Sequence, residues 1–198
     1  MSTRRFMFII TILILALAAT GSAIWLTLKS HRGAIVSVLD IGGPFSLLDH
    51  TGKRVTEADY AGRVQVIFFG YTYCPDICPT ELSRISAVMD ALGDAADHVV
   101  PIFVTVDPDR DTVEVMRDYQ QSFHPGIQML TGKPAEIAAM QAHYRVYAQR
   151  VGADENYLMD HSSNTFLMDR AGTFVTHFTQ RSSVEDMTTR LRAMVEKS

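Results

Sequence analysis

The chain has 198 residues, of which 47% are hydrophobic and 20% are charged, and these proportions are those of an ordinary globular protein. Its formal net charge is −4, from 18 Lys and Arg against 22 Asp and Glu. Nucleic-acid binding depends on cations that meet phosphates, so a mildly acidic chain without a basic stripe excludes nucleic acid from the expected partners. The length suits one domain with an additional segment.

The first feature along the chain is an apolar stretch without charges, from Phe6 to Leu28. A stretch of about 23 residues is long enough to cross a bilayer core of about 30 Å as a helix. We therefore expect residues 1–28 to form an N-terminal membrane anchor, a single transmembrane helix, and residues 29–40 to form a linker. The remaining residues, 41–198, are expected to form the functional domain.

A cleaved signal peptide is the alternative interpretation, because Ala16-Leu17-Ala18 and Gly21-Ser22-Ala23 both resemble cleavage sites. The apolar core of such peptides has about 7–15 residues, and the greater length here favours an anchor. Either interpretation exports the domain. Because an Arg-rich and Ser-rich presequence is absent, we expect a bacterial inner (cytoplasmic) membrane with the domain in the periplasm, rather than the mitochondrial inner membrane.

The residue pattern in the first half of the domain predicts a hairpin, two strands and a helix. Residues 45–56 predict a β-hairpin with its turn at Gly52. The continuous apolar runs at residues 64–70 and 99–106 predict strands that are covered on both faces. Between these two strands, apolar residues at helical spacing predict a helix over residues 80–92.

The next segment predicts a helix over residues 113–123, with Asp111 as its cap and Glu114 as the partner of the cap. A short strand is expected at residues 127–130. A further helix follows at residues 134–144.

The last part of the domain contains three strand signals and one helix signal. Residues 146–150 are expected to form a strand that enters a hairpin. Residues 164–169 and 173–178 flank a turn and predict two antiparallel strands. Ser182 with Glu185 is expected to open the final helix. This order of elements predicts a three-layer α/β domain with a mixed sheet.

The two cysteines of the chain, Cys74 and Cys78, lie where the first long strand meets its helix, which is the thioredoxin-like arrangement. At this spacing both thiols lie on one side of a helical turn, and a helix N-terminus favours thiolates. A disulfide that closes so short a loop stabilises the fold very little, which disfavours a structural role. The pair is therefore expected to be redox-active or to bind a metal.

The spacing of the cysteines favours metal binding over redox chemistry alone. Thioredoxin-type oxidoreductases use C-x-x-C, whereas three residues separate Cys74 from Cys78. Two thiolates suit Cu(I) or zinc, and one added imidazole gives a ligand set that copper sites use. The spacing does not choose between the metals, and it does not identify the third ligand.

Three segments resemble motifs of the Sco/SenC family, which comprises copper-binding assembly factors of cytochrome c oxidase. The segments are Cys74-Pro-Asp-Ile-Cys78-Pro, Val106-Asp107-Pro-Asp-Arg-Asp111-Thr and Tyr157-Leu-Met-Asp160-His161-Ser-Ser. The resemblance covers roughly residues 41–195 and implies a thioredoxin-like fold. It also implies copper, as Cu(I) or Cu(II), held by Cys74, Cys78 and His161. One departure is Asp169-Arg170, where the family has Asp-Pro, in a turn beyond these ligands.

The resemblance further implies a metallochaperone rather than an enzyme. Such a protein receives copper from an upstream donor protein and delivers it to the copper A centre of cytochrome c oxidase subunit II. The alternative is a thiol-disulfide oxidoreductase that reduces the target's cysteines with the same pair. A peroxidase of the peroxiredoxin kind is a third hypothesis, but Thr80 and Arg84 do not stand in the arrangement that it needs.

Three acidic residues are candidates for supporting roles. Asp160 is expected to orient the imidazole of His161, since metal-bound histidines usually donate their second N–H. Asp107 is expected to influence thiol protonation or partner docking, or only to end its strand. Asp76 is expected to favour the helix start electrostatically. The other histidines lack a ligand-like context: His31, His50, His98, His124, His143 and His177. Three methionines are expected in the core: Met89, Met116 and Met140.

Overall fold

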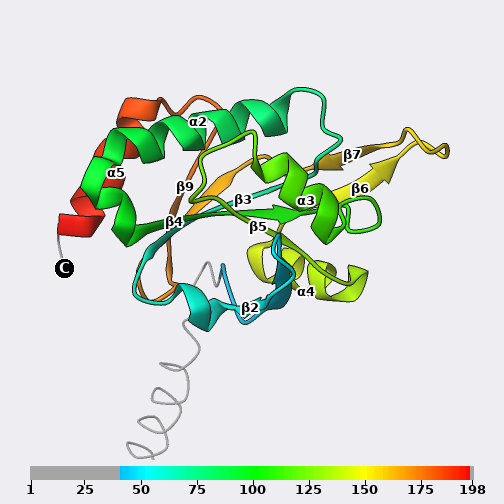
Figure 1. The fold of residues 1–198 in the computed structure, drawn as a ribbon, viewed down its shortest axis with the longest axis horizontal. Coiled ribbons are helices and arrows are strands. Elements are labelled where there is room, and N and C mark those ends of the chain that lie inside the picture. Colours follow the sequence, from blue (N-terminus) through cyan, green and yellow to red (C-terminus); the bar gives the residue numbers. More distant parts are fainter. Residues whose placement is uncertain (1–40, 197–198) are drawn as a thin grey trace, which may run out of the picture. The chain divides into compact units, whose positions relative to one another are not determined.

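Residues 41–196 are described by the structure, which is a computed structural model (Figure 1). The predicted membrane anchor at residues 1–28 and the linker at residues 29–40 lie outside the described residues. Within residues 41–196, no helix combines the length and the apolar character that crossing a bilayer requires.

A seven-stranded mixed sheet forms the centre of the domain, with the strand order β2-β1-β5-β4-β3-β8-β9. Its strands are β1 (Ser46–Asp49), β2 (Arg54–Thr56), β3 (Val64–Gly70), β4 (Val99–Thr105), β5 (Gln128–Thr131), β8 (Thr165–Met168) and β9 (Phe174–Phe178). β4 pairs in parallel with β3 and β5, and the other pairs are antiparallel. The predicted mixed sheet is confirmed.

The helices cover both faces of this sheet. They are α2 (Ile77–Leu92), α3 (Val113–Gln120), α4 (Pro134–Tyr144) and α5 (Val184–Glu196), with short 3-10 helices at η1 (Glu57–Tyr60) and η2 (Gly93–His98). In Figure 1, α2 and α5 lie together on one side of the sheet, and α4 lies on the other side. All seven residues of β3 and all seven of β4 are buried, as their continuous apolar sequences predict.

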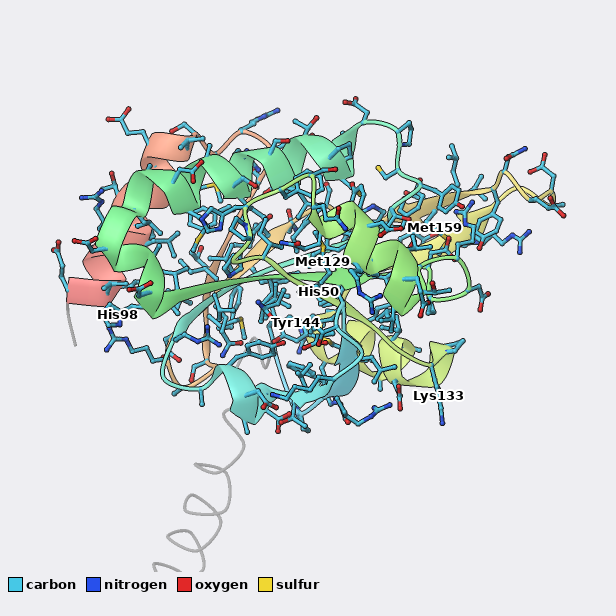
Figure 2. The ribbon with its side chains drawn as sticks, viewed as in Figure 1. His50, His98, Met129, Lys133, Tyr144 and Met159 are labelled. Carbon is cyan, nitrogen blue, oxygen red and sulfur yellow. The ribbon has the colours of Figure 1, made fainter. Side chains whose placement is uncertain are left out.

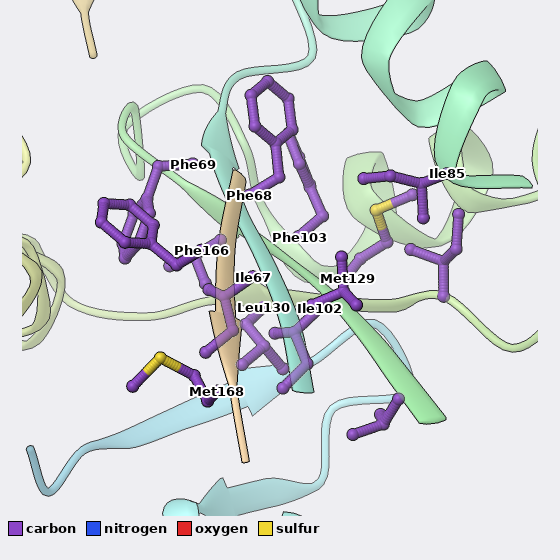
Figure 3. Close-up of a cluster of buried hydrophobic side chains, with 14 of the residues drawn as sticks. Ile67, Phe68, Phe69, Ile85, Ile102, Phe103, Met129, Leu130, Phe166 and Met168 are labelled. Atoms are coloured by element: carbon purple, nitrogen blue, oxygen red, sulfur yellow. The ribbon is translucent and has the colours of Figure 1, made fainter. Parts of the chain in front are cut away.

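The central strand β3 contributes aromatic side chains to both layers of the core. Successive side chains of a strand point to opposite faces, so Phe68 and Phe69 pack into separate layers. Phe69 contacts Tyr144 of α4 and Phe166 of β8, with ring centroids 5.3 and 5.9 Å apart, whereas Phe68 packs against Phe103 at 6.0 Å (Figure 3). Truncating one such buried ring to alanine typically costs about 3–5 kcal/mol. The end of β3, where the cysteines follow, is therefore rigidly placed.

Two helix starts and one helix cap differ from the sequence prediction. α2 begins at Ile77 rather than at residue 80, so Cys78 lies within its first turn. The cap of α3 is Thr112, whose side chain accepts a hydrogen bond from the amide of Val115. The prediction of Asp111 as this cap is wrong, because that carboxylate is buried and accepts other hydrogen bonds. The final helix starts at Val184.

The capping partners of α5 are shifted by one residue from the predicted Ser182 and Glu185. The hydroxyl of Ser183 accepts a hydrogen bond from the amide of Asp186 at 3.0 Å, and the Asp186 carboxylate accepts one from the amide of Ser183 at 3.3 Å. This reciprocal pair is a capping box one residue further along the chain.

A second, two-stranded sheet lies outside the main one and is called the β6–β7 hairpin below. It pairs β6 (Ala148–Val151) with β7 (Leu158–His161) in antiparallel register, with Ala148 opposite His161. The sequence predicts β6 as a strand that enters a hairpin, but it does not predict β7. In Figure 1 the hairpin extends away from the seven-stranded sheet. Most of its residues are exposed or half-buried.

Candidate metal centre

The two cysteines lie at the carboxyl end of β3, where the strand turns into α2. Cys74 is half-buried in the connecting loop, and Cys78 is fully buried in the first turn of the helix. Both thiols are free. The amide of Cys78 donates a hydrogen bond to the sulfur of Cys74, with 3.4 Å between the atoms. The helix start therefore stabilises negative charge on Cys74.

A glycine at the end of β3 makes room for the buried sulfur. A Cβ atom at Gly70 would lie 2.8 Å from Sγ of Cys78 and 2.7 Å from the ring of Phe103. These distances are shorter than van der Waals contact, so a larger residue at this position would displace the thiol. The local sequence Phe69-Gly70-Tyr71 thus admits Cys78 to the core.

The imidazole of His161 approaches the cysteines from the end of β7. Its Nε2 lies 3.7 Å from Sγ of Cys78, although the two residues are 83 positions apart in the chain. Its Nδ1 lies 2.9 Å from the carbonyl oxygen of Ser162. A carbonyl oxygen only accepts hydrogen bonds, so Nδ1 donates to it and Nε2 faces the sulfur.

The separation between sulfur and nitrogen matches two ligands of one metal ion. Metal–sulfur and metal–nitrogen bonds of about 2.3 and 2.0 Å, as zinc has, place the two donor atoms about 3.5–3.7 Å apart in tetrahedral or trigonal geometry. The distance between Cys78 and His161 is 3.7 Å. Among residues 41–196, however, no three Cys, His, Asp or Glu side chains already form a closed metal cage. The side chains would have to close around an incoming ion.

The two thiols share one proton. The hydrogen bond from the Cys78 thiol lowers the pKa of Cys74 to about 3, although burial acts in the opposite direction. The same interaction raises the pKa of Cys78, and burial raises it further. At neutral pH the pair therefore holds a thiolate on Cys74 and a neutral thiol on Cys78. A partly exposed thiolate is both a nucleophile and a metal ligand.

The ring of Tyr71 completes the wall beside the imidazole. Its centroid lies 5.8 Å from that of His161, and the rings meet edge to face at 86°. Burial raises the pKa of Tyr71, while a hydrogen bond with the backbone of Met159 lowers it. Met159 belongs to β7, where it lies opposite Arg150 of β6, and it is labelled in Figure 2. Tyr71 therefore joins the cysteine loop to the strand that carries His161.

The three acidic candidates lie in three different surroundings. Asp160 is exposed. The hydrogen bond from the His161 ring, which the sequence predicts Asp160 to accept, goes to the carbonyl oxygen of Ser162. Asp107 is buried and binds Arg110 and Tyr157 instead of a thiol, with contacts of 2.6 and 2.7 Å. Asp76 is exposed at the N-terminus of α2, where its backbone helps to lower the pKa of Cys74.

Asp111 is a supporting residue whose role the sequence did not predict. Its carboxylate accepts hydrogen bonds from the amide and hydroxyl of Thr72, the latter at 2.5 Å, and from the hydroxyl of Thr105 at 2.6 Å. Burial raises its pKa, and these hydrogen bonds oppose the rise. Thr72 lies two residues before Cys74, so Asp111 ties the cysteine loop to β4.

The arginine that a peroxidase would need turns away from the cysteines. Arg84 forms a short ion pair with the buried Glu81 and donates to the carbonyl oxygens of Gln180 and Ser182, at 3.0 and 2.6 Å. Glu81 in turn accepts a hydrogen bond from the hydroxyl of Thr165 in β8. Arg84 thus joins α2 to the loop before α5.

His50, one of the histidines that are not expected to bind a metal, has a structural role. Nδ1 of His50 lies 3.4 Å from the amide of Met129, and the two residues are neighbours in Figure 2. The expectation that His50 is satisfied within the fold is confirmed. Met89, Met116 and Met140 are buried in the core, as predicted.

The candidate site opens to solvent. A cavity of about 270 Å³ lies beside Cys74 and is also lined by Tyr71, Ile77, Met159 and His161. Large apolar side chains are exposed on the two segments that carry the ligands, the cysteine loop with the start of α2 and the β6–β7 hairpin with its preceding residue: Tyr73, Ile77, Tyr147, Val151 and Leu158. A partner protein can therefore reach the thiolate of Cys74.

Comparison with known proteins identifies close relatives. The model of the SCO1/SenC family matches residues 35–196. Protein SCO1 homolog 1 from the mitochondria of Arabidopsis thaliana is 43% identical over 150 residues, which are 75% of this chain and 45% of that protein. The chain therefore spans less than half the length of that relative.

Two solved structures of copper-bound relatives share the fold. The structure of Bradyrhizobium japonicum ScoI with copper bound is 48% identical, with a TM-score of 0.74, and the match covers 78% of this chain and 99% of that one. Arabidopsis thaliana ScoI with copper bound is 39% identical, with a TM-score of 0.75, over 80% of this chain and 99% of that one. The thioredoxin-like, mixed α/β fold is thereby confirmed.

Proposed function

The chain belongs to the SCO1/SenC family, and we propose that it is a copper metallochaperone for the assembly of cytochrome c oxidase. Copper is its cargo, with Cys74, Cys78 and His161 as the ligands. The observation that carries this proposal is the 3.7 Å approach of the His161 imidazole to the sulfur of Cys78. The copper-bound relatives from Bradyrhizobium japonicum and Arabidopsis thaliana support the choice of metal.

Loading begins at the half-buried thiolate of Cys74. Because the pKa of Cys74 is lowered to about 3, this sulfur needs no deprotonation at neutral pH. The ion then displaces the proton of Cys78, since metal-bound cysteines are thiolates. The Nε2 lone pair of His161 supplies the third bond. Two thiolates and one imidazole form a ligand set that accommodates Cu(I) and Cu(II).

Delivery uses the openness of the site. Three protein ligands leave a coordination position free, so a thiolate of the target can enter and displace the ligands one after another. The target in this proposal is the copper A centre of cytochrome c oxidase subunit II, and an upstream donor protein supplies the copper. Oxidation of Cys74 and Cys78 to a disulfide removes both sulfur ligands and prevents loading.

The proposed location is the periplasmic side of a bacterial inner membrane. Residues 1–28 would anchor the chain, and residues 41–198 would work outside the cytoplasm, where copper A centres are assembled. Alkaline phosphatase fused after Ser198 is expected to be active, because that enzyme folds only after export. An inactive fusion at a normal expression level would contradict this location.

A thiol-disulfide oxidoreductase is the second candidate function, and the asymmetry of the two thiols favours it. The partly exposed Cys74 thiolate is suited to attack a disulfide of the target, and the buried Cys78 is suited to resolve the mixed disulfide. The net reaction oxidises the two thiols of this chain to a disulfide and reduces the target's disulfide to two thiols. The same pair would then prepare the target for copper.

His161→Ala distinguishes the two functions in the full-length chain. This variant is expected to lose tight copper binding, leaving only weak binding by the cysteines, while thiol–disulfide exchange continues at a near-normal rate. Under the metallochaperone proposal the variant fails to support oxidase assembly in a strain that lacks the wild-type chain. If the variant supports normal assembly, copper delivery is not the function, and the chain acts as a thiol-disulfide oxidoreductase.

A further inference from the structure

The β6–β7 hairpin is attached to the domain by few contacts, although it carries His161. In the described part of the chain, its two strands pair only with each other and form a sheet separate from the seven-stranded one. Its exposed side chains include those of Val151 and Leu158. A hairpin of this kind is only marginally stable by itself, so contacts from outside must fix its position. The position of the His161 imidazole relative to the cysteines depends on these contacts.

Arg110 supplies several of the contacts at once. Its guanidinium carbon lies 3.6 Å from the centroid of the Tyr157 ring, next to β7, and its Nη1 donates to the carbonyl oxygen of Glu155 at 3.4 Å. The same guanidinium lies 4.5 and 5.9 Å from the ring centroids of Tyr73 and Tyr71, which flank the start of the cysteine loop. Arg110 therefore touches both segments that form the candidate metal centre.

Asp107 holds this arginine in place. One carboxylate oxygen accepts from Nε of Arg110 at 2.6 Å, and the other accepts from the hydroxyl of Tyr157 at 2.7 Å. Nη2 of Arg110 is buried without a hydrogen-bond partner among residues 41–196, which fits a guanidinium enclosed by aromatic rings. The arginine is thus oriented by one carboxylate and stacked on several rings, and lysine could not reproduce this geometry.

We propose that Arg110 is the positioning residue of the metal centre: by clamping Tyr157 to Tyr71 and Tyr73, it sets the imidazole of His161 against the cysteines. Asp107 and Arg110 lie in the second of the three family-like motifs, and the copper chemistry uses neither directly. The effect of Arg110 on copper binding rests on the proposed function, whereas its effect on the position of the β6–β7 hairpin does not. The copper affinity and the hairpin position are therefore measured separately.

A second arginine on the same ring offers a matched control. The guanidinium carbon of Arg150 lies 3.7 Å from the centroid of Tyr157, so the ring lies between two guanidinium groups. Within residues 41–196, however, Arg150 donates only to backbone carbonyl oxygens of its own hairpin, at residues 152–154. It does not join the hairpin to the cysteine loop. Arg150→Met removes the same kind of stacking without removing the clamp.

The first measurement needs no copper. Proton cross-peaks between the rings of Tyr71 and His161 are recorded by NMR in the reduced, copper-free, full-length chain, with the cross-peak between Phe69 and Phe166 as a reference for the core. Arg110→Met is expected to lose the first cross-peak and keep the second. Arg150→Met is expected to keep both.

Arg110→Lys is measured in parallel in case the Met variant does not fold. It keeps a charge for Asp107 but lacks the flat guanidinium, so the cross-peak between Tyr71 and His161 is expected to weaken. A wild-type cross-peak in every folded Arg110 variant would overturn the proposal.

The second measurement is a double-mutant cycle on copper affinity. Arg110→Met is expected to lower affinity about tenfold in the wild-type background, on the scale of a desolvated cation–π contact, and to have no effect on the residual binding of His161→Ala. An equal loss in both backgrounds would show that Arg110 does not act through His161, and would overturn the proposal. If the wild-type chain binds no copper, the proposed function fails, and the NMR result still decides whether Arg110 positions the hairpin.

Discussion

The amide of Cys78 donates a hydrogen bond to the sulfur of Cys74 at 3.4 Å, and this bond, together with the interaction between the two side chains, makes the two cysteines chemically different. Cys74, which a partner can reach, is the thiolate, and the buried Cys78 keeps the proton. An open thiolate begins metal binding or disulfide attack, and the protected thiol completes either process. The asymmetry therefore underlies both candidate functions.

Alkylation of Cys74 tests the asymmetry directly. Iodoacetamide is expected to modify Cys74 well below pH 7, because its pKa is lowered to about 3. Cys78→Ala removes the thiol but keeps the amide that donates to Cys74, and it is expected to raise the pKa of Cys74 toward its ordinary value near 9, whereas Cys78→Ser keeps a side-chain donor and most of the shift. Rates measured by mass spectrometry between pH 3 and 10 provide the check. Equal pH profiles for all three chains would contradict the assignment.

The thiol pair also predicts how stability depends on pH. Between about pH 3 and 9 the folded pair binds one proton and the unfolded pair binds two, so its contribution to the free energy of unfolding rises with pH. Above pH 9 the unfolded chain loses both protons while the raised pKa of Cys78 retains one in the fold, so the contribution falls. Denaturant unfolding of the reduced chain, compared with a Cys74→Ser, Cys78→Ser chain, is expected to show a difference that peaks near pH 9. A difference that declines steadily from acid to neutral pH would be the opposite of this expectation.

Asp111 is expected to be important for stability although it touches neither cysteine. Asp111→Ala leaves donors of the half-buried Thr72 and the buried Thr105 without partners and should lower the free energy of unfolding by about 3 kcal/mol. Asp97→Ala, at an exposed position in η2, is the control and should change it by less than about 0.5 kcal/mol. Urea unfolding measures both. Similar small losses in the two variants would mean that the cysteine loop does not depend on Asp111.

Gly70→Ala is expected to weaken copper binding by displacing the buried sulfur. The added Cβ would lie 2.8 Å from Sγ of Cys78 and should destabilise the fold by about 1–3 kcal/mol. Gly132→Ala is a matched control, since its Cβ would lie 2.9 Å from a carboxylate oxygen of Glu136 and 3.0 Å from Leu47. Copper titrations should show weaker binding only for the Gly70 variant. Unchanged affinity in Gly70→Ala would argue against Cys78 as a ligand.

The sequence predicted those parts of the fold that short-range pattern determines. The strands at residues 64–70 and 99–106 were clear because each is a continuous apolar run that only a buried strand explains. The sequence does not predict β7, because Leu158-Met-Asp-His alternates weakly and its partner among the described residues is the short strand β6. It predicts the start of α2 three residues too late, since Cys74 to Pro79 gives little periodic signal.

The candidate site was predictable only in part. The cysteine pair stood out from its spacing, whereas His161 was identified through the resemblance alone, because no local pattern distinguishes it from a surface histidine. The roles of Asp107 and Asp111 could not be predicted, since each binds residues that are distant in sequence, such as Tyr157 and Thr72. Contacts of this kind are fixed by tertiary packing.

X-ray absorption of the copper-loaded, reduced, full-length chain tests most directly whether two sulfurs and one imidazole hold the same ion. The wild type is expected to show two sulfur neighbours and one imidazole nitrogen, and His161→Ala is expected to lose the nitrogen and keep both sulfurs. Identical copper environments in the two chains, with sulfur as the only protein ligand, would contradict the account.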